Sequence, residues 1–133
     1  RMRVDAISNE LSEKQQNYIE KIIGRPMEVN AKQWINFSRI TFVHKTQKER
    51  LTIDVNLTFE NSNEKGDMKH IVIAEVKQER MSRSSDFMRI AKEMYILPIR
   101  ISKYCLTTLA LNPKLKKNRF KEKVLFINKL KQA

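Results

Sequence analysis

An unbroken alternation of apolar and polar residues from Arg50 to Phe59 constrains the fold of this chain more than any other feature. Its apolar members are Leu51, Ile53, Val55, Leu57 and Phe59, and its polar members are Arg50, Thr52, Asp54, Asn56 and Thr58. Because successive side chains of a strand point to opposite faces, a period of two predicts a strand over 50–59 with one apolar and one polar face. The apolar face has to be covered, so this strand belongs in a sheet with a hydrophobic side.

Two further strands are predicted beside it, over 36–44 and 69–79, with a polar turn at Asn61–Asp67. Short connections between consecutive strands favour an antiparallel meander. We expect Ile53 and Val72 on its covered side. The opposite face gathers charges of both signs, namely Arg39, Arg50, Asp54, Glu75 and Lys77.

Four helices are predicted around these strands, over 12–23, 85–95, 102–111 and 115–130. Ser12, Ser85 and Ser102 stand where an N-cap is required, and Gly24 follows the first helix as a stop signal. The order of one helix, three strands and three helices predicts a single α+β domain over 1–133.

The chain is strongly basic, with 27 Lys+Arg against 15 Asp+Glu and a net charge of +12 in 133 residues. Residues 114–131 hold seven Lys, one Arg and one Glu, so 8 − 1 = +7 of that charge lies near the C-terminus. Such an excess favours a polyanionic partner: nucleic acid, an anionic membrane surface or a phosphate-rich small molecule. The sequence has one Cys and no apolar run near the ~18 residues of a membrane span, which favours a cytoplasmic protein.

The sharpest chemical signal is the strand Ile71–Lys77, which ends in Glu75-x-Lys77. This spacing puts a carboxylate and an ammonium on one face, roughly 7 Å apart along the strand. A carboxylate so placed can hold Mg²⁺ or Mn²⁺, which share oxygen ligands with substrate phosphates. Arg39 and Arg50 can join the same face, and arginine suits bidentate phosphate binding. An ordinary cross-strand ion pair is the alternative interpretation.

Ser102-Lys103 adds a helix N-terminus, where unpaired backbone N–H groups favour a phosphate. A plain Ser cap beside a solvated Lys is the preferred interpretation of this pair taken alone. The sequence contains no P-loop, no GxSxG motif and no zinc-ligand cluster. Most nucleotide-binding and hydrolase families that are recognised by local motifs are thereby excluded.

Five separated motifs occur together in the chain. They are Phe37–Phe42 (FSRITF), Glu49–Leu57 (ERLTIDVNL), Ile73–Gln78 (IAEVKQ), Ser102–Cys105 (SKYC) and Leu115–Lys121 (LKKNRFK). In order and spacing they resemble the C-terminal half of the VTC (vacuolar transporter chaperone) domain, over roughly residues 37–130. That domain forms the polyphosphate polymerase branch of the triphosphate tunnel metalloenzymes, the CYTH-like superfamily.

The resemblance implies a closed antiparallel tunnel whose lumen binds ATP and polyphosphate and transfers the γ-phosphate of ATP to the growing chain. It implies that Arg39, Arg50, Lys77, Ser102 and Lys103 bind phosphate, that Glu75 binds Mn²⁺ or Mg²⁺, and that Glu75, Lys77 and Arg50 are catalytic. The family's N-terminal half has no counterpart here, apart from a basic strand end at residues 1–4. We therefore expect the missing half or a second copy as partner, and an inactive fragment when the chain is alone.

Two other functions fit the same residues. Asp54 and Glu75-x-Lys77 could form the metal site of a PD-(D/E)xK nuclease. The Ser102–Cys105 and Asn118–Lys121 motifs then have no explanation, which disfavours nucleic acid as the partner. A non-catalytic polyanion-binding module would rely on charge alone and show a steep salt dependence without a metal requirement.

Overall fold

The computed structural model describes residues 8, 10–80, 82 and 85–131. It divides into two compact units, Arg1–Lys32 and Gln33–Ala133, which are described separately. The predicted strand end at residues 1–4 lies outside the described residues.

The first unit contains helix α1, Glu13–Ile23, close to its predicted range. Ser12 begins it with a capping box: its hydroxyl accepts from the Gln15 backbone N–H, and the Gln15 side chain accepts from the Ser12 N–H at 2.7 Å. Gly24 ends it in the left-handed conformation, at φ 76°. None of its side chains is buried.

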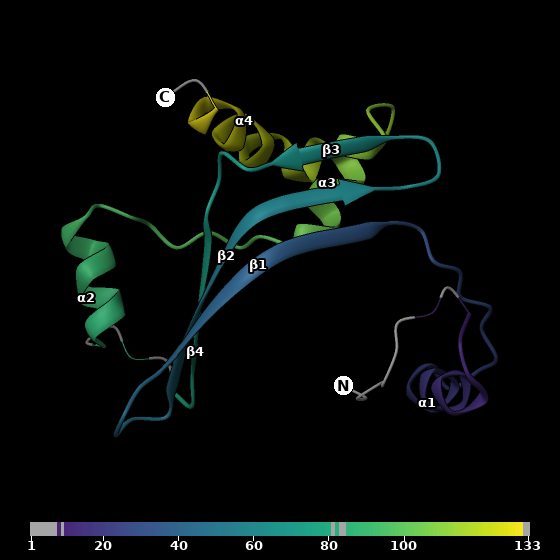
Figure 1. The fold of residues 1–133 in the computed structure, drawn as a ribbon, viewed down its shortest axis with the longest axis horizontal. Helices are drawn as coiled ribbons and strands as arrows, with labels where there is room; N and C mark the ends of the chain where they lie inside the picture. The colour runs from purple at the N-terminus through teal and green to yellow at the C-terminus, as the bar shows by residue number, and fades with distance from the viewer. Residues whose placement is uncertain (1–7, 9, 81, 83–84, 132–133) are drawn as a thin grey trace. The chain divides into compact units, whose positions relative to one another are not determined.

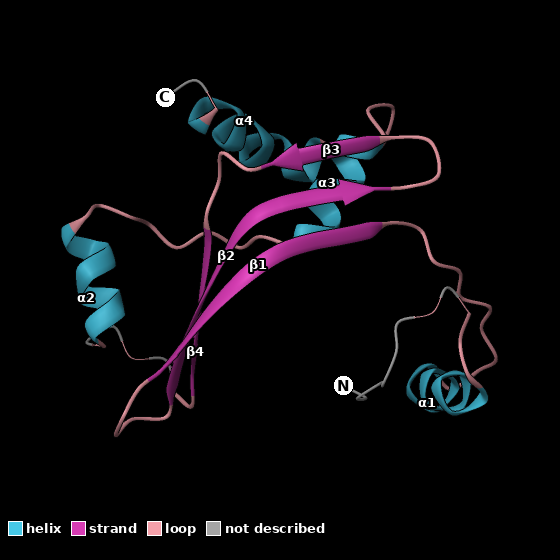
Figure 2. Ribbon diagram, viewed as in Figure 1, coloured by secondary structure: helices cyan, strands magenta, loops and turns pink. Residues whose placement is uncertain are grey.

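The second unit is built on a four-stranded antiparallel sheet (Figures 1 and 2). Its strands are β1 (Trp34–Val43), β2 (Glu49–Glu60), β3 (Lys65–Met68) and β4 (Ile73–Gln78). The long strand β2 pairs with β1 along one edge. Along the other edge it pairs with β4 over its first half and with β3 over its last residues.

The strand predicted over 69–79 was wrong in its bounds, because this region is covered in part by β4, Ile73–Gln78. The range 69–79 begins outside any strand, because the backbone from Lys69 to Val72 breaks the ladder between β3 and β4. Part of the segment Asn61–Asp67, expected to be a turn, instead forms most of β3, where Gly66 lies opposite Phe59. A Cβ at position 66 would meet the Phe59 ring at 2.7 Å, so glycine permits this close pairing.

The sheet is open and is not closed into a barrel, so the described residues do not form the tunnel of which this chain was expected to be a part. A barrel interior wide enough for side chains needs about eight strands, and the described residues supply four. The observed class is α+β: an open antiparallel sheet with helices.

A β-bulge at Asn56 changes the face to which the residues of β2 point. Asn36 pairs with Thr58 and Ser38 with Val55, so two residues of β2, Asn56 and Leu57, lie opposite the single residue Phe37. Asn56 adopts a positive φ of 56°, a conformation that asparagine tolerates better than most residues.

The bulge makes the prediction of one continuous apolar face wrong. Ile35 lies two positions from Phe37 and four from Arg39 on β1, so the three share a face, and Ile35 pairs with Phe59. Leu57 and Phe59 therefore share the face of Asp54, whereas Ile53 belongs to the opposite face.

Helices α3 (Lys103–Leu111) and α4 (Lys121–Leu130) help to form the core over the second half of β2. Its buried residues are Leu57, Ile71, Leu106 and Ile127, with Ile35, Met68, Ile73 and Ile101 packed against them. Helix α3 follows its predicted range and its Ser102 cap. The last helix begins later than predicted: Leu115–Lys117 is not helical, and a 3₁₀ turn, η1 (Asn118–Phe120), precedes α4 without a side-chain cap.

Helix α2, Asp86–Glu93, begins at the predicted cap Ser85 and ends two residues before the predicted end. The apolar face of the first half of the sheet is poorly covered, since Ile40 and Phe42 are about half exposed and Ile53 is half-buried. Val72 is 64% exposed, so its predicted place on a covered side was wrong.

Candidate functional site

Three rungs of the sheet bring the predicted charges onto one face. Across β1, β2 and β4 the rungs are Arg39–Asp54–Ile73, Thr41–Thr52–Glu75 and Val43–Arg50–Lys77. Residues directly opposite each other share a face, and alternate rungs repeat it. Arg39, Arg50, Glu75 and Lys77 therefore lie on one face together with Asp54, in the arrangement that the alternation predicted. We call these five residues and Lys103 of α3 the charged face.

Asp54 forms the centre of this charged face. Its side chain is only 2% exposed, and Arg39 binds it through two hydrogen bonds, from Nε to Oδ1 at 2.6 Å and from Nη2 to Oδ2 at 2.8 Å. Lys103 donates to the same carboxylate, with Nζ 2.5 Å from Oδ2. A buried carboxylate thus holds two cations, one from the sheet and one from the first residue of α3.

These contacts stabilise the ionised forms of Asp54 and Arg39. The hydrogen bonds from Arg39 lower the pKa of Asp54 to about 2, assisted by Lys103 and opposed by burial. The pKa of Arg39 is raised above its ordinary value, chiefly by its hydrogen bond to Asp54. Hydrogen bonds to a charged form stabilise that form.

The placement of α3 brings Lys103 to the sheet. The helix packs on β1 and β3, and its Leu106 is buried in the core. Thr107 is fully buried and accepts a hydrogen bond from the Gln33 side chain, just before β1, at 2.7 Å. Ser102 caps the helix, its Oγ accepting from the Cys105 N–H at 3.3 Å. Here Ser102 acts as a cap, and no phosphate contact is needed to explain it.

Phe37 also belongs to this site, although it was not among the predicted site residues. The Arg39 guanidinium carbon and the Lys103 ammonium nitrogen each lie 5.0 Å from the centre of its ring. Such cation–π contacts help to fix the position of both cations. Its position two residues before Arg39 was the available signal, because that spacing puts both side chains on one face.

Glu75 and Lys77 form an ion pair on β4, with Nζ 3.0 Å from Oε1 and both side chains nearly half exposed. The hydrogen bond from Lys77 lowers the pKa of Glu75 against the effect of burial, and the charges of Lys77, Lys103 and Arg39 lower it further. Arg50 lies opposite Lys77, is exposed, and takes part in no ion pair with any residue that the structure describes.

No group of three or more His, Cys, Asp or Glu side chains that could hold a metal occurs in the described part of the chain. The Asp54 oxygens already bind Arg39 and Lys103, so Glu75, whose Oε1 is paired with Lys77, is the other carboxylate of the charged face that could contribute to a metal site. One carboxylate is compatible with Mg²⁺ or Mn²⁺ only where substrate phosphates and water supply the other ligands, as is common for Mg²⁺.

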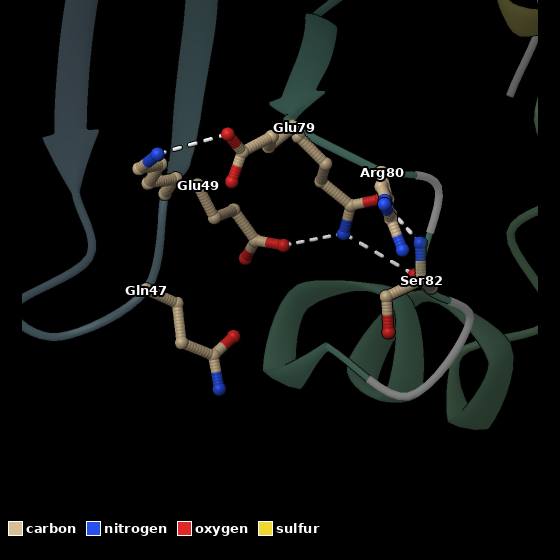
Figure 3. A pocket seen from close by; sticks show the side chains of 7 residues that line it. Gln47, Glu49, Glu79, Arg80 and Ser82 are labelled. Atoms are coloured by element: carbon tan, nitrogen blue, oxygen red, sulfur yellow. Dashed lines mark hydrogen bonds and ion pairs between the residues drawn. The ribbon is translucent and has the colours of Figure 1, made fainter.

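A separate hollow of about 190 Å³ lies beyond the Arg50–Lys77 rung (Figure 3). It is lined by Gln47, Lys48, Glu49, Gln78, Glu79, Arg80 and Ser82. The Gln78 amide nitrogen donates to the Glu49 carboxylate and to the Ser82 carbonyl. The volume is small for a nucleotide site, and these bonds give the hollow a structural role in joining the segment after β4 to the start of β2.

The charged face carries Arg39, Arg50, Lys77 and Lys103 against Asp54 and Glu75, a balance of 4 − 2 = +2. Such a balance gives this face of the sheet a positive potential, which favours anions over cations. A family model for the VTC domain matches residues 2–112, and the chain belongs to this family. Membership implies a polyphosphate polymerase-type domain, since the family includes polyphosphate polymerase catalytic domains.

Searches of curated proteins and of solved structures found no match. Among the described residues there is no helix with the length and hydrophobicity that a membrane crossing requires.

Proposed function

We propose that the charged face binds the phosphate groups of ATP and inorganic polyphosphate in a polyphosphate polymerase-type tunnel domain. The observation that supports this most directly is the convergence of Arg39 and Lys103 on Asp54, with Arg50 and Lys77 on the same face. Membership of the VTC domain family supports phosphate chains as the anion, because polyphosphate polymerase domains belong to that family.

The spacing of the cations favours a chain of phosphates over a single phosphate. Arg50 and Asp54 are four residues apart on β2, or roughly 13 Å along the strand. Cations therefore lie at both ends of an extended site, with Arg50 and Lys77 at one end and Arg39 and Lys103 at the other. A linear triphosphate or polyphosphate can contact both ends at once.

The proposed reaction is phosphoryl transfer from ATP to polyphosphate. Its transition state spreads negative charge over the transferred group, so catalysis depends on positioning and on electrostatic stabilisation. In this proposal Arg50 and Lys77 stabilise that charge, Arg39 and Lys103 hold the phosphate chain, and Ser102 orients Lys103 by capping α3. Glu75 would hold Mn²⁺ or Mg²⁺, whose chemistry is to neutralise phosphate oxygens.

We further propose that other strands complete the tunnel around this face. In the open sheet, the Arg39, Glu75 and Lys77 side chains of the charged face are each more than 40% exposed. The remaining strands would come from the other half of the domain or from a second copy, and the chain alone is expected to be inactive. A cytoplasmic location stays a prediction.

The deciding experiment incubates the intact protein with ATP and Mn²⁺ and measures polyphosphate formation. Glu75→Gln should abolish the metal-dependent reaction, whereas the matched variant Glu64→Gln, in the exposed turn before β3, should keep it. Full activity in Glu75→Gln would refute the assignment of Glu75.

Absence of product together with metal-dependent cleavage of DNA would favour the nuclease. The structure gives that alternative little support, since the Asp54 oxygens are bound by two cations. Metal-independent binding of polyphosphate without any turnover would favour the non-catalytic polyanion-binding module.

A further inference from the structure

We propose that Asp54 is a positioning residue that orients Arg39 and Lys103 for phosphate binding. This inference rests on the proposed function, because it assigns a role within the same site. Asp54 itself contacts neither a phosphate nor a metal in this proposal. It acts through the two cations that it holds.

The carboxylate leaves most of the hydrogen-bond donors of its partners available. Arg39 has five N–H donors, of which Nε and one on Nη2 bind Asp54, so three remain. Lys103 has three donors, and one binds Asp54. The remaining donors belong to side chains that are 41% and 19% exposed, so a ligand can reach them.

The direction of these remaining donors is fixed by contacts with Asp54 and with Phe37. The bidentate contact orients the guanidinium plane of Arg39, and the Phe37 ring lies 5.0 Å from both cationic groups. Arg39 and Lys103 repel each other because both lie beside the same carboxylate, and the negative charge of Asp54 offsets that repulsion. The cations are therefore preorganised, and a phosphate chain loses less conformational entropy when it binds them.

The positioning role of Asp54 and its negative charge have opposite effects on the affinity for an anion, which makes the proposal testable. The negative charge of Asp54 lowers the attraction of the charged face for an anion. If Asp54 affected binding through charge alone, its removal would tighten binding. If it positions the two cations, its removal weakens binding although the net charge rises.

The experiment is calorimetric titration of the full chain with inorganic tripolyphosphate, without metal. Asp54→Asn should weaken binding about tenfold, the loss expected for one charge-assisted hydrogen bond. The control is Asp67→Asn on β3, which changes the net charge equally. Among the described residues, the Asp67 carboxylate accepts a side-chain hydrogen bond only from the nearby Lys69 N–H. We expect Asp67→Asn to bind as the wild type does, or slightly more tightly.

Asp54→Glu separates position from charge, because it keeps the carboxylate and displaces it by one methylene. Asp54→Glu should weaken binding severalfold at an unchanged net charge. If circular dichroism shows Asp54→Asn to be unfolded, Asp54→Glu alone decides whether Asp54 acts by position or by charge. In a Lys103→Met background the effect of Asp54→Asn should shrink, because one of the two positioned cations is gone.

Wild-type affinity in folded Asp54→Asn and Asp54→Glu would overturn this proposal and leave the proposed function intact. A variant with lower thermal stability but unchanged affinity would overturn it as well, since that result indicates a structural ion pair only. Failure of the wild-type chain to bind tripolyphosphate would overturn both.

Discussion

The bulge at Asn56 divides β2 into two halves, which place different kinds of residue on the same face of the sheet. Before the bulge, this face carries the polar and charged residues Arg50, Thr52 and Asp54, next to Glu75 and Lys77. After the bulge, Leu57 and Phe59 are buried on the same side, and Leu57 packs against Leu106 and Ile127. One extra residue at Asn56 separates the candidate site from the core.

The comparison shows how a small domain can support a charged site. Helix α3 crosses from one half to the other: its first residue, Lys103, binds Asp54, and Leu106 is buried against Leu57. The apolar half therefore stabilises the fold by burying its side chains, and this burial holds α3 in place. The position of α3 in turn places Lys103 beside Asp54 in the polar half. Stability should depend more strongly on the apolar half, and anion binding on the polar half.

The largest expected effect is on stability, from Leu57→Ala in the apolar half. Leu57 is 2% exposed, and truncating a buried leucine costs about 2–5 kcal/mol in the free energy of unfolding. Leu51→Ala, at a half-buried position on the other face of the first half, is the matched control and should cost about 1 kcal/mol. Urea unfolding measures both, and equal losses would contradict the proposed division of β2.

The next effect is on binding, from Arg39→Met in the polar half. Loss of its charged hydrogen bonds should weaken tripolyphosphate binding about 10- to 100-fold. Arg119→Met removes the same charge from η1, where the side chain is exposed and forms no ion pair with the described residues. Solvent and salt screen that charge, so we expect less than about a twofold change. Similar losses in the two variants would show that bulk charge governs binding.

A third prediction concerns acid. The pKa of Asp54 is about 2 in the folded protein, below its ordinary 3.8, so its stabilisation is present above pH 3.8 and is lost as the pH falls towards 2. The loss is about 2 kcal/mol. Unfolding of wild type and Asp54→Asn at pH 5, 4, 3 and 2 should show a stability difference that narrows as the pH falls. A constant difference would disagree with a lowered pKa.

The smallest effect is expected at the boundary between the halves. Asn56→Val places a β-branched residue at φ 56° and should lower stability by about 1–2 kcal/mol. Asn56→Gly, which tolerates that backbone, should stay within about 0.5 kcal/mol of wild type. A thermal melt compares the two. If Val is tolerated as well as Gly, the left-handed residue does not hold the bulge in place.

Local signals predicted much of this fold. The serine caps at Ser12, Ser85 and Ser102 were confirmed because capping involves only neighbouring residues. The shared face of Arg39, Arg50, Glu75 and Lys77 followed from strand periodicity alone. Periodicity is therefore sufficient to group these charges on one face, whereas the roles assigned to the residues stay predictions.

The errors arose where a tertiary feature overrode a regular pattern. Alternation continues through Asn56 in the sequence, so hydrophobicity alone cannot reveal that the bulge moves Leu57 to the other face. Asparagine, which tolerates a positive φ, was the only local hint. Gly66 indicated a turn, but it lies within β3, where the Phe59 ring leaves no room for a side chain. The contact of Lys103 with Asp54 joins distant segments and could not be predicted from spacing.

Lys103 and Leu106 lie one turn apart on α3, so the binding of a ligand to Lys103 should affect how often this helix unfolds locally. Any anion that binds Lys103 in the native state stabilises that state by mass action. Amide protons of Leu106 and Thr107, which lie in this helix next to the core, should then exchange with solvent more slowly as tripolyphosphate is added. The backbone of this helix would report binding at the charged face without any assay of catalysis.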